Sequence, residues 1–142
     1  KTSRYLPQNN RIKIEKRSIN PWQWQDARNY AQAVEVKNVL STLYVSGQTA
    51  INDEGVSSNE GMRIQLVKTI ENLEKVILES NYELKNIVRL NIYTTDSTEL
   101  FENFDLIQDW LTKNEVKQAS TVLEVKSLFE TLKVELEATV VM

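Results

Sequence analysis

The sequence predicts an α+β fold in which two helices pack on one face of a mixed β-sheet. Two long segments place apolar residues at helical spacing, and five shorter ones alternate or are rich in β-branched residues. Their order along the chain is β-β-α-β-α-β-β, with a further short strand possible near the start. Two helices against one side of a single sheet are typical of this order.

The first elements are strands. A short strand is expected at 13–17. Residues 30–36 and 42–48 both alternate apolar and polar side chains, and the short connection 37–41 predicts that they pair as a hairpin. The polar segment 49–58 is expected to form an exposed loop.

Ser58 is predicted to cap the first helix, about 20 residues long. One apolar face repeats every three or four positions, formed by Met62, Leu66, Ile70, Leu73 and Ile77. The helix is expected to end at Asn81 or Tyr82. A strand rich in β-branched residues follows at 87–95.

Asp96 is predicted to cap the second helix, with Glu99 as its capping-box partner. The buried face of this helix is expected to hold Leu100, Phe104, Ile107 and Leu111. Two closing strands are predicted at 120–126 and 133–141.

The last strand has two different faces. Val134, Leu136, Ala138 and Val140 point one way, and Glu135, Glu137 and Thr139 point the other. Since two helices cover only one side of the sheet, its second side meets solvent or another subunit. A homo-oligomer is therefore expected.

The amino-acid composition limits the kinds of catalytic group that the chain can supply. The chain has 142 residues, the size of one domain, and its formal net charge of −3 argues against bulk affinity for nucleic acid. It contains neither cysteine nor histidine, which excludes thiolate and imidazole catalysis and the metal sites built on them. Carboxylates, Lys, Tyr, hydroxyls and backbone amides remain.

The N-terminus is basic. Six Lys and Arg residues precede position 18, against Glu15 alone, so residues 1–19 are expected to form a basic arm or edge strand ahead of one domain at 20–142. Such an arm is either a solvated strand or a phosphate-binding segment. No apolar stretch is long enough for a membrane span or a signal peptide, and zero cysteine fits a cytoplasmic protein.

Four segments together resemble the RidA family, also called the YjgF or L-PSP endoribonuclease family. They read LYVSGQ at 43–48, ENL at 71–73, IVRLNIYTTD at 87–96 and VELEAT at 134–139, and the resemblance runs from about Asn20 to Met142. It implies a chorismate-mutase-like fold and a homotrimeric barrel. It also implies inter-subunit clefts in which small carboxylate-bearing molecules bind and enamines or imines such as 2-aminoacrylate are hydrolysed, without metal or cofactor.

The resemblance also assigns residues. It implies that Glu135 positions the attacking water and that the backbone of Ser46 and Gly47 lines the cleft. Tyr30 matches an aromatic residue at the cleft mouth. A family Asn falls at Phe104, or at Asn103 if the gap is placed differently.

The sequence departs from the deaminase motif at its main ligand contact. Ser120 stands where the family has the Arg that binds the substrate carboxylate, and Val122 stands where it often has Cys. Losing a bidentate Arg weakens carboxylate binding by roughly tenfold to a hundredfold. We therefore expect poor activity on 2-aminoacrylate and a less acidic ligand, unless Arg28, Arg89 or Lys126 reaches the cleft.

Each of these residues has a plainer interpretation. Glu135 is a general base or an ordinary strand carboxylate, and its pair with Glu137 lacks a third ligand for a metal. Ser120, with no imidazole to activate it, is a ligand donor or a strand-start hydroxyl. Trp22 and Trp24 either anchor the terminal segment or cover an apolar ligand.

Three functions follow in order of preference. The first is enamine or imine hydrolysis by a homotrimer without cofactors. The second is a small-ligand-binding trimer without catalysis. The third is RNA binding or cleavage, as in relatives described as endoribonucleases or translation inhibitors, which the acidic body and the missing histidine disfavour.

Overall fold

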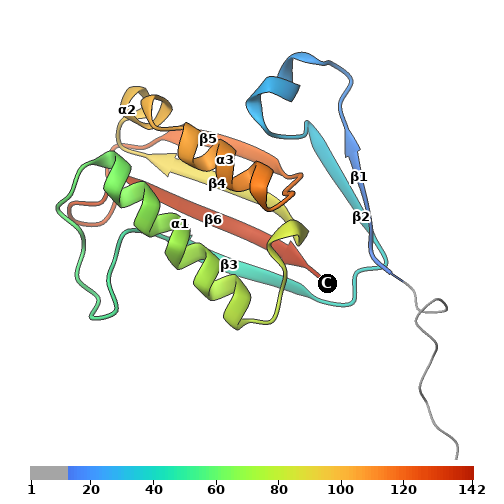
Figure 1. Ribbon diagram of the computed structural model, residues 1–142, viewed down its shortest axis with the longest axis horizontal. Helices are drawn as coiled ribbons and strands as arrows, with labels where there is room; N and C mark the ends of the chain where they lie inside the picture. The colour runs from blue at the N-terminus through green and yellow to red at the C-terminus, as the bar shows by residue number, and fades with distance from the viewer. Residues whose placement is uncertain (1–12) are drawn as a thin grey trace, which may run out of the picture.

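The computed structural model describes residues 13–142, so Lys1, Arg4 and Arg11 of the predicted arm lie outside the described residues. The α+β prediction is confirmed, because the helices lie against one face of a mixed sheet (Figure 1). The elements are β1 (Glu15–Ile19), η2 (Trp24–Arg28), β2 (Ala33–Lys37), β3 (Thr42–Gln48), α1 (Met62–Glu79), η3 (Leu84–Asn86), β4 (Ile87–Thr94), α2 (Ser97–Glu102), α3 (Asp105–Lys113), β5 (Ala119–Glu124) and β6 (Val134–Val141).

The described strands form two sheets. Strands β1 and β2 make an antiparallel pair, and the other four are ordered β3-β6-β4-β5. Only β4 and β5 are parallel in the larger sheet, and helices α2 and α3 provide the crossover between them. The larger sheet is thus mixed, as the sequence predicts.

The predicted hairpin between 30–36 and 42–48 is wrong. Strand β2 pairs with β1, and β3 pairs with β6 at the other end of the chain. Asn38 adopts a left-handed backbone (φ 62°), and the amides of Leu40 and Ser41 donate to the Met142 carbonyl oxygen. The connection therefore leads the chain away from β2 and onto the C-terminal strand.

The predicted cap of the first helix is also wrong, because Gly61 rather than Ser58 precedes α1. The Ser58 amide donates to the Ala50 carbonyl, and its own carbonyl accepts from the Thr131 hydroxyl and the Gln65 side chain. These bonds hold Ser58 in the preceding loop. The helix ends at Glu79, slightly before the predicted Asn81.

The second helix begins as predicted but is interrupted. The Asp96 side chain accepts a hydrogen bond from the Glu99 amide at 3.0 Å, which confirms the cap. Helix α2 stops where Asn103 donates from its side chain to the Glu99 carbonyl. Phe104 follows at this break and precedes α3.

Alternation along β6 separates a buried face from an open one. Val134, Leu136, Ala138 and Val140 are buried in the core between sheet and helices, and Glu135, Glu137 and Thr139 are only half-buried. In the described part of the chain no helix covers that second face (Figure 1). The two-faced strand predicted from the sequence is therefore present.

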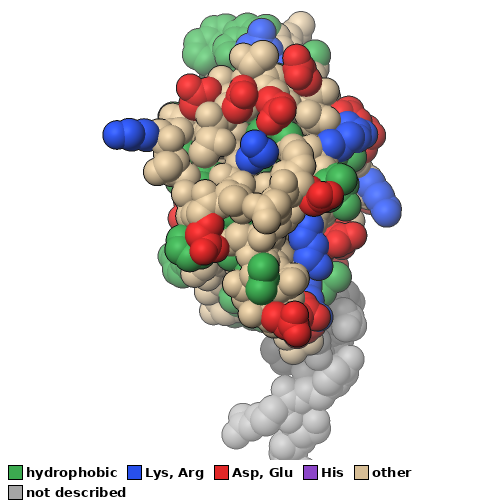
Figure 2. Space-filling view, turned by 90° about the vertical axis from the view of Figure 1, so that its left-hand side faces the viewer, with side chains coloured by type: hydrophobic (Ala, Val, Ile, Leu, Met, Phe, Trp, Pro, Cys, Tyr) green, Lys and Arg blue, Asp and Glu red, His purple; other side chains and the backbone are tan. Residues whose placement is uncertain are grey.

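Surface charge is mixed on the side of the molecule at the left of Figure 1. Acidic and basic side chains intermingle there, and no continuous basic patch is visible among the described residues in view (Figure 2). Within residues 13–142, no helix is both long and apolar enough to cross a membrane.

Candidate functional site

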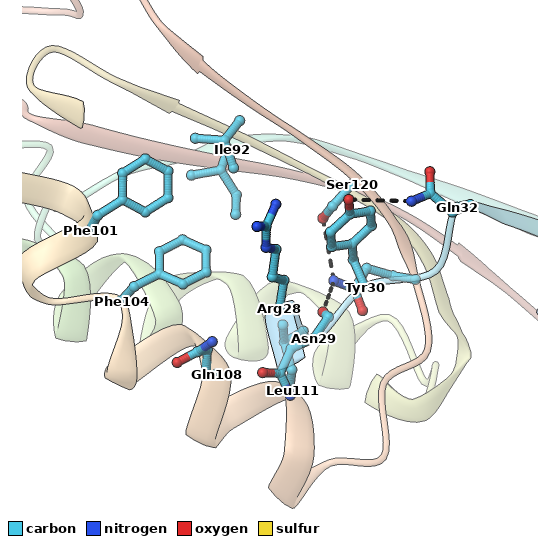
Figure 3. Close-up of a pocket in the computed structure, with 12 residues that line it drawn as sticks. Arg28, Asn29, Tyr30, Gln32, Ile92, Phe101, Phe104, Gln108, Leu111 and Ser120 are labelled. Carbon is cyan, nitrogen blue, oxygen red and sulfur yellow. Dashed lines mark hydrogen bonds between the residues drawn. The ribbon is translucent and has the colours of Figure 1, made fainter. Parts of the chain in front are cut away.

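A cavity of about 740 Å³ lies between segment 28–32, the edge of the larger sheet and helices α2 and α3 (Figure 3). Its apolar lining comes from Ile92, Phe101, Phe104, Leu111 and Val122. Its polar lining comes from Arg28, Asn29, Tyr30, Gln32, Gln108, Gln118 and Ser120. A cleft that combines an apolar wall with polar groups converging on it is typical of a small-molecule site.

Arg28 extends into this cavity. Figure 3 shows its guanidinium between the Phe101 and Phe104 rings on one side and Tyr30 and Ser120 on the other. The guanidinium carbon lies 5.1 Å from the ring centroid of Trp24, a cation–π distance. Arg28 is the one charged residue among the described residues that line the cavity, and none of residues 13–142 forms a salt bridge with it.

Gln118 fixes the segment that presents Arg28. Its backbone carbonyl accepts from the Ala31 amide at 2.8 Å, and its side-chain Nε2 donates to the Asn29 carbonyl at 3.0 Å. Asn29 also donates from Nδ2 to the Thr112 hydroxyl at 3.1 Å. These bonds attach residues 29–31 to β5 and α3, so Arg28 projects from a fixed segment.

Ser120 and Val122 both line the cavity from β5. The Ser120 hydroxyl donates to the Leu90 carbonyl at 2.6 Å and accepts from Gln118 Nε2 at 3.3 Å. Its proton is therefore directed at the neighbouring strand. The small side chain leaves open space at the place where the family motif has Arg.

Tyr30 and Phe104 lie on the cavity wall, and the sequence alternative Asn103 does not. The Asn103 side chain donates to the Glu99 carbonyl and accepts from Arg63. Phe104 pairs instead with Phe101 at a centroid distance of 5.3 Å. The break between α2 and α3 is what places both rings at the cavity.

Several lining residues were not predicted from the sequence, including Phe101, Gln108 and Gln118. Two phenylalanines three positions apart share one side of a helical turn, which is a signal for Phe101. Nothing in the sequence pattern singles out the two glutamines, because their role depends on the position of segment 28–32.

The remaining predicted residues lie on the open face of the sheet. An ideal Cβ built on Gly47 would fall 1.7 Å from Glu135 Oε2 and 2.6 Å from its Cδ. The missing side chain of Gly47 thus makes room for the Glu135 carboxylate. Ser46 is exposed beside them, where the β3–β6 register shifts between Val45 and Gln48.

Two carboxylates on this face differ in environment. Burial, and secondarily the nearby charge of Glu137, raise the pKa of Glu135 above its ordinary value. Glu137 accepts hydrogen bonds from Tyr93 at 2.9 Å and Asn91 at 3.2 Å, and the bond from Tyr93 raises the pKa of that phenol. No hydrogen bond from residues 13–142 reaches Glu135, which leaves its oxygens free to hold a water.

Pairing registers place Glu135 and the cavity on opposite faces of the same sheet. Val122 pairs with Ile92, and Ile92 pairs with the buried Leu136, so all three face the helices. Glu135 pairs with Tyr93 and points the other way. One chain alone therefore divides the predicted site residues into two groups, Tyr30, Phe104, Ser120 and Val122 on one face and Ser46, Gly47 and Glu135 on the other.

Of the three candidate cations, Arg28 is the one that lines the cavity. Arg89 is exposed on β4 and donates to Asn91, and Lys126 is exposed after β5. Within residues 13–142, no group of three His, Cys, Asp or Glu side chains is placed to hold a metal ion.

Comparison with known proteins gives one consistent family. Residues 23–142 match the family model described as Endoribonuclease L-PSP. A RutC family protein of Aquifex aeolicus is 33% identical over 108 residues, which cover 76% of this chain and 84% of that protein.

Solved structures show the same fold. The Rid family protein YyfB of Yersinia pestis superposes with a TM-score of 0.79 at 24% identity, covering 89% of this chain and 98% of that one. Escherichia coli TdcF with bound serine gives a TM-score of 0.65 at 17% identity, covering 80% and 87%.

Proposed function

The chain belongs to the endoribonuclease L-PSP family, also named RidA or YjgF, and from this premise we propose that it hydrolyses a small enamine or imine in a cleft completed by a second copy of the chain. The cavity of one copy would bind the substrate. Glu135, with Ser46 and Gly47, would reach it from the other copy.

The separation of the two groups of residues carries this proposal. The cavity contains a cation and apolar walls but no carboxylate among its described lining residues. The open face contains a free carboxylate with a raised pKa beside Gly47, and no helix of the described chain covers it. A second copy packed on the open face would bring both groups together, as in the homotrimer that the family resemblance implies.

Glu135 supplies the proton transfers that this hydrolysis needs. An enamine first becomes an imine when one proton moves from nitrogen to carbon. As water attacks the C=N carbon, one of its protons passes to Glu135 and the π electrons become a nitrogen lone pair. Glu135 then returns the proton to nitrogen, which gives a carbinolamine. Glu135 next takes the proton of the carbinolamine hydroxyl and passes it to nitrogen, so that the oxygen electrons form the C=O bond as the C–N bond breaks and ammonia leaves.

The cavity has room for an amino-acid-derived substrate, including one with a bulky side chain. Its volume of about 740 Å³ lies in the range of small-molecule sites. The TdcF structure, which shares the fold, contains serine, a molecule of the same size class as 2-aminoacrylate. Both observations support an amino-acid-derived imine as the first substrate to test.

Ammonia release from freshly generated 2-aminoacrylate and from a neutral imine tests the proposal. Glu135→Gln removes the proposed general base and is expected to lower the hydrolysis rate by about 10²- to 10⁴-fold. The matched variant is Glu137→Gln, on the same strand and face. It is expected to retain turnover and to move the acid limb of the pH profile to lower pH, because a like charge near Glu135 is removed.

A wild-type protein inert on both substrates would overturn the hydrolytic proposal, and so would full activity in Glu135→Gln. Binding without turnover would instead favour the second candidate, a non-catalytic ligand-binding protein. One observation favours that candidate: the described cavity lining includes no residue from the open face. Sedimentation of the wild type tests the assembly, since a monomer would leave the two groups of residues apart.

A further inference from the structure

Arg28 has a charge that the described structure leaves unmatched. It is the one charged residue among the described lining of the cavity. No acidic residue is among the described lining of the cavity. Asp26 accepts a hydrogen bond from the Gln25 side chain at 2.7 Å, and Asp105 at the start of α3 pairs with Arg63 at 2.8 Å, so neither forms an ion pair with Arg28. Arg28 is exposed to solvent at this cleft, so its charge is available to attract an anion that enters it.

We propose that Arg28 is the specificity-determining residue of this cavity, binding the anionic group of a ligand whose aromatic body packs on Phe101 and Phe104. The cation thus comes from the N-terminal segment instead of the strand position now held by Ser120. This inference rests on the proposed function, which puts the ligand in this cavity, and it names the ligand class.

The position of Trp24 leaves the binding edge of Arg28 free. The guanidinium carbon lies 5.1 Å from the Trp24 ring centroid, a cation–π contact, and within residues 13–142 the guanidinium donates no hydrogen bond. Its N–H donors lie in the plane and form a fork that matches a carboxylate. Trp24 is itself supported edge-on by Tyr30 at a centroid distance of 6.4 Å.

Ser120 makes this arrangement possible. Its hydroxyl is directed at the Leu90 carbonyl, and its small side chain leaves the space that Arg28 enters (Figure 3). A long cation on β5 would occupy the same cavity and repel Arg28. Ser120 and Arg28 together therefore provide an alternative to an Arg at position 120.

The apolar wall points to an aromatic body. Phe101 is 56% exposed although it is apolar, and its ring lies 5.3 Å from that of Phe104. A planar ligand ring bound against this pair would cover surface that is otherwise exposed to water. An aromatic acid should therefore bind better than a small aliphatic acid.

Calorimetric titration of the full-length protein with benzoate, benzamide and acetate tests the inference. Wild type is expected to bind benzoate at least about tenfold more tightly than either of the other two probes. In Arg28→Gln, benzoate binding should weaken about tenfold to a hundredfold and benzamide binding should stay within about twofold. The benzoate affinity of Arg28→Lys should lie between those of wild type and Arg28→Gln, since the positive charge remains but the two-pronged hydrogen bonding of the guanidinium is lost.

The other candidate cations provide the matched controls. Lys126→Gln should bind all three probes as wild type does, because Lys126 does not line the cavity. Arg89→Gln tests the competing cation, because Arg89 lies on the open face that a second copy would bring to the cavity. Phe101→Ala should lose the preference for benzoate over acetate and keep the dependence on Arg28. Circular dichroism spectra and melting curves confirm that each variant is folded.

The outcomes separate this inference from the proposed function. Equal binding of benzoate and benzamide by wild type, or loss of benzoate binding in Arg89→Gln instead of Arg28→Gln, would overturn the role of Arg28 even if imines are hydrolysed. Arg28-dependent benzoate binding by a protein that releases no ammonia would support the inference and overturn only the hydrolytic proposal.

Discussion

The helix-side cavity and the open face of the sheet are built from the same strands but have opposite character. On the cavity side, β4 and β5 present Ile92, Ser120 and Val122, and Arg28 adds a positive charge. On the open face, neighbouring positions of β4 and β6 present Tyr93, Glu135 and Glu137. One side is a cavity with a cation, and the other is a surface with carboxylates.

This difference shows that side chains of the same strands can form two surfaces with different chemistry. Successive side chains point to opposite faces, so residues adjacent in sequence are separated by the thickness of the sheet. The cavity contains a cation without a carboxylate among its described lining residues, and the base Glu135 lies on the open face. Variants on each face should therefore affect different properties.

Replacing one side chain on each face of β6 should give the largest contrast. Leu136 is fully buried, and Leu136→Ala should lower the free energy of unfolding by about 2–5 kcal/mol. Glu135→Ala, at the adjacent position, should change it by less than about 1 kcal/mol. Urea denaturation measures both. A comparable loss in Glu135→Ala would mean that this carboxylate makes contacts that stabilise the fold, against the unbonded carboxylate described above.

Gly47→Ala should disturb the open face and leave the core intact. The new methyl group would overlap the Glu135 carboxylate, which is the flexible end of a side chain and moves aside. Ammonia release should fall about tenfold to a hundredfold with little change in melting temperature. Gly61→Ala, with nothing within 4 Å of the added Cβ, is the matched control. Full activity in Gly47→Ala would contradict the position assigned to Glu135.

Trp24→Leu should affect only the cavity side. Loss of the cation–π contact, worth about 0.5–1 kcal/mol, should weaken benzoate binding about two- to fivefold. Trp22→Leu is the control, because Trp22 stacks on Trp24 at 6.0 Å while the contact with Arg28 comes from Trp24. Equal effects of the two variants would show that the pair acts by shaping the segment and not through Arg28.

The smallest predicted effect is the pH dependence that Glu135 gives to the stability of the fold. Since the pKa of Glu135 is raised in the folded protein, the folded state holds its proton more tightly than the unfolded state. Its contribution to stability is favourable at low pH and is lost as pH rises through the raised pKa.

Glu135→Gln should therefore melt slightly higher than wild type at pH 7, and the difference should vanish as pH falls below the ordinary pKa of a Glu side chain. Calorimetric scans at constant ionic strength measure this. A lower melting temperature for the variant at pH 7 would mean that the folded state stabilises the ionised carboxylate.

Local patterns predicted the elements well and their partners less well. The helix stripe from Met62 to Ile77, the cap at Asp96 and the alternation of β6 all follow from spacing within one segment. The hairpin prediction failed because the alternation of apolar and polar residues in 42–48 is compatible with pairing to any strand. Its pairing with β6 depends on contacts between residues about 100 positions apart.

The candidate site shows the same limit. The resemblance names Tyr30, Phe104, Ser120, Val122, Gly47 and Glu135 for one inter-subunit cleft; in one chain the first four line a single cavity, and Gly47 and Glu135 lie on the other face of the sheet. Sequence reasoning also left Arg28, Arg89 and Lys126 as equal candidates for the missing cation. Only the hydrogen bonds of Gln118 to segment 29–31 distinguish them.

By itself, the sequence determined the α+β class, the buried face of each helix, the two faces of the last strand and the exclusion of thiol and imidazole chemistry. These depend on residue type and on periodicity, which are local properties of the chain. The tertiary structure decided which strands pair, that Arg28 enters the cavity, and that Glu135 lies across the sheet from it. Those outcomes depend on packing between segments far apart in the chain, and no local spacing encodes them.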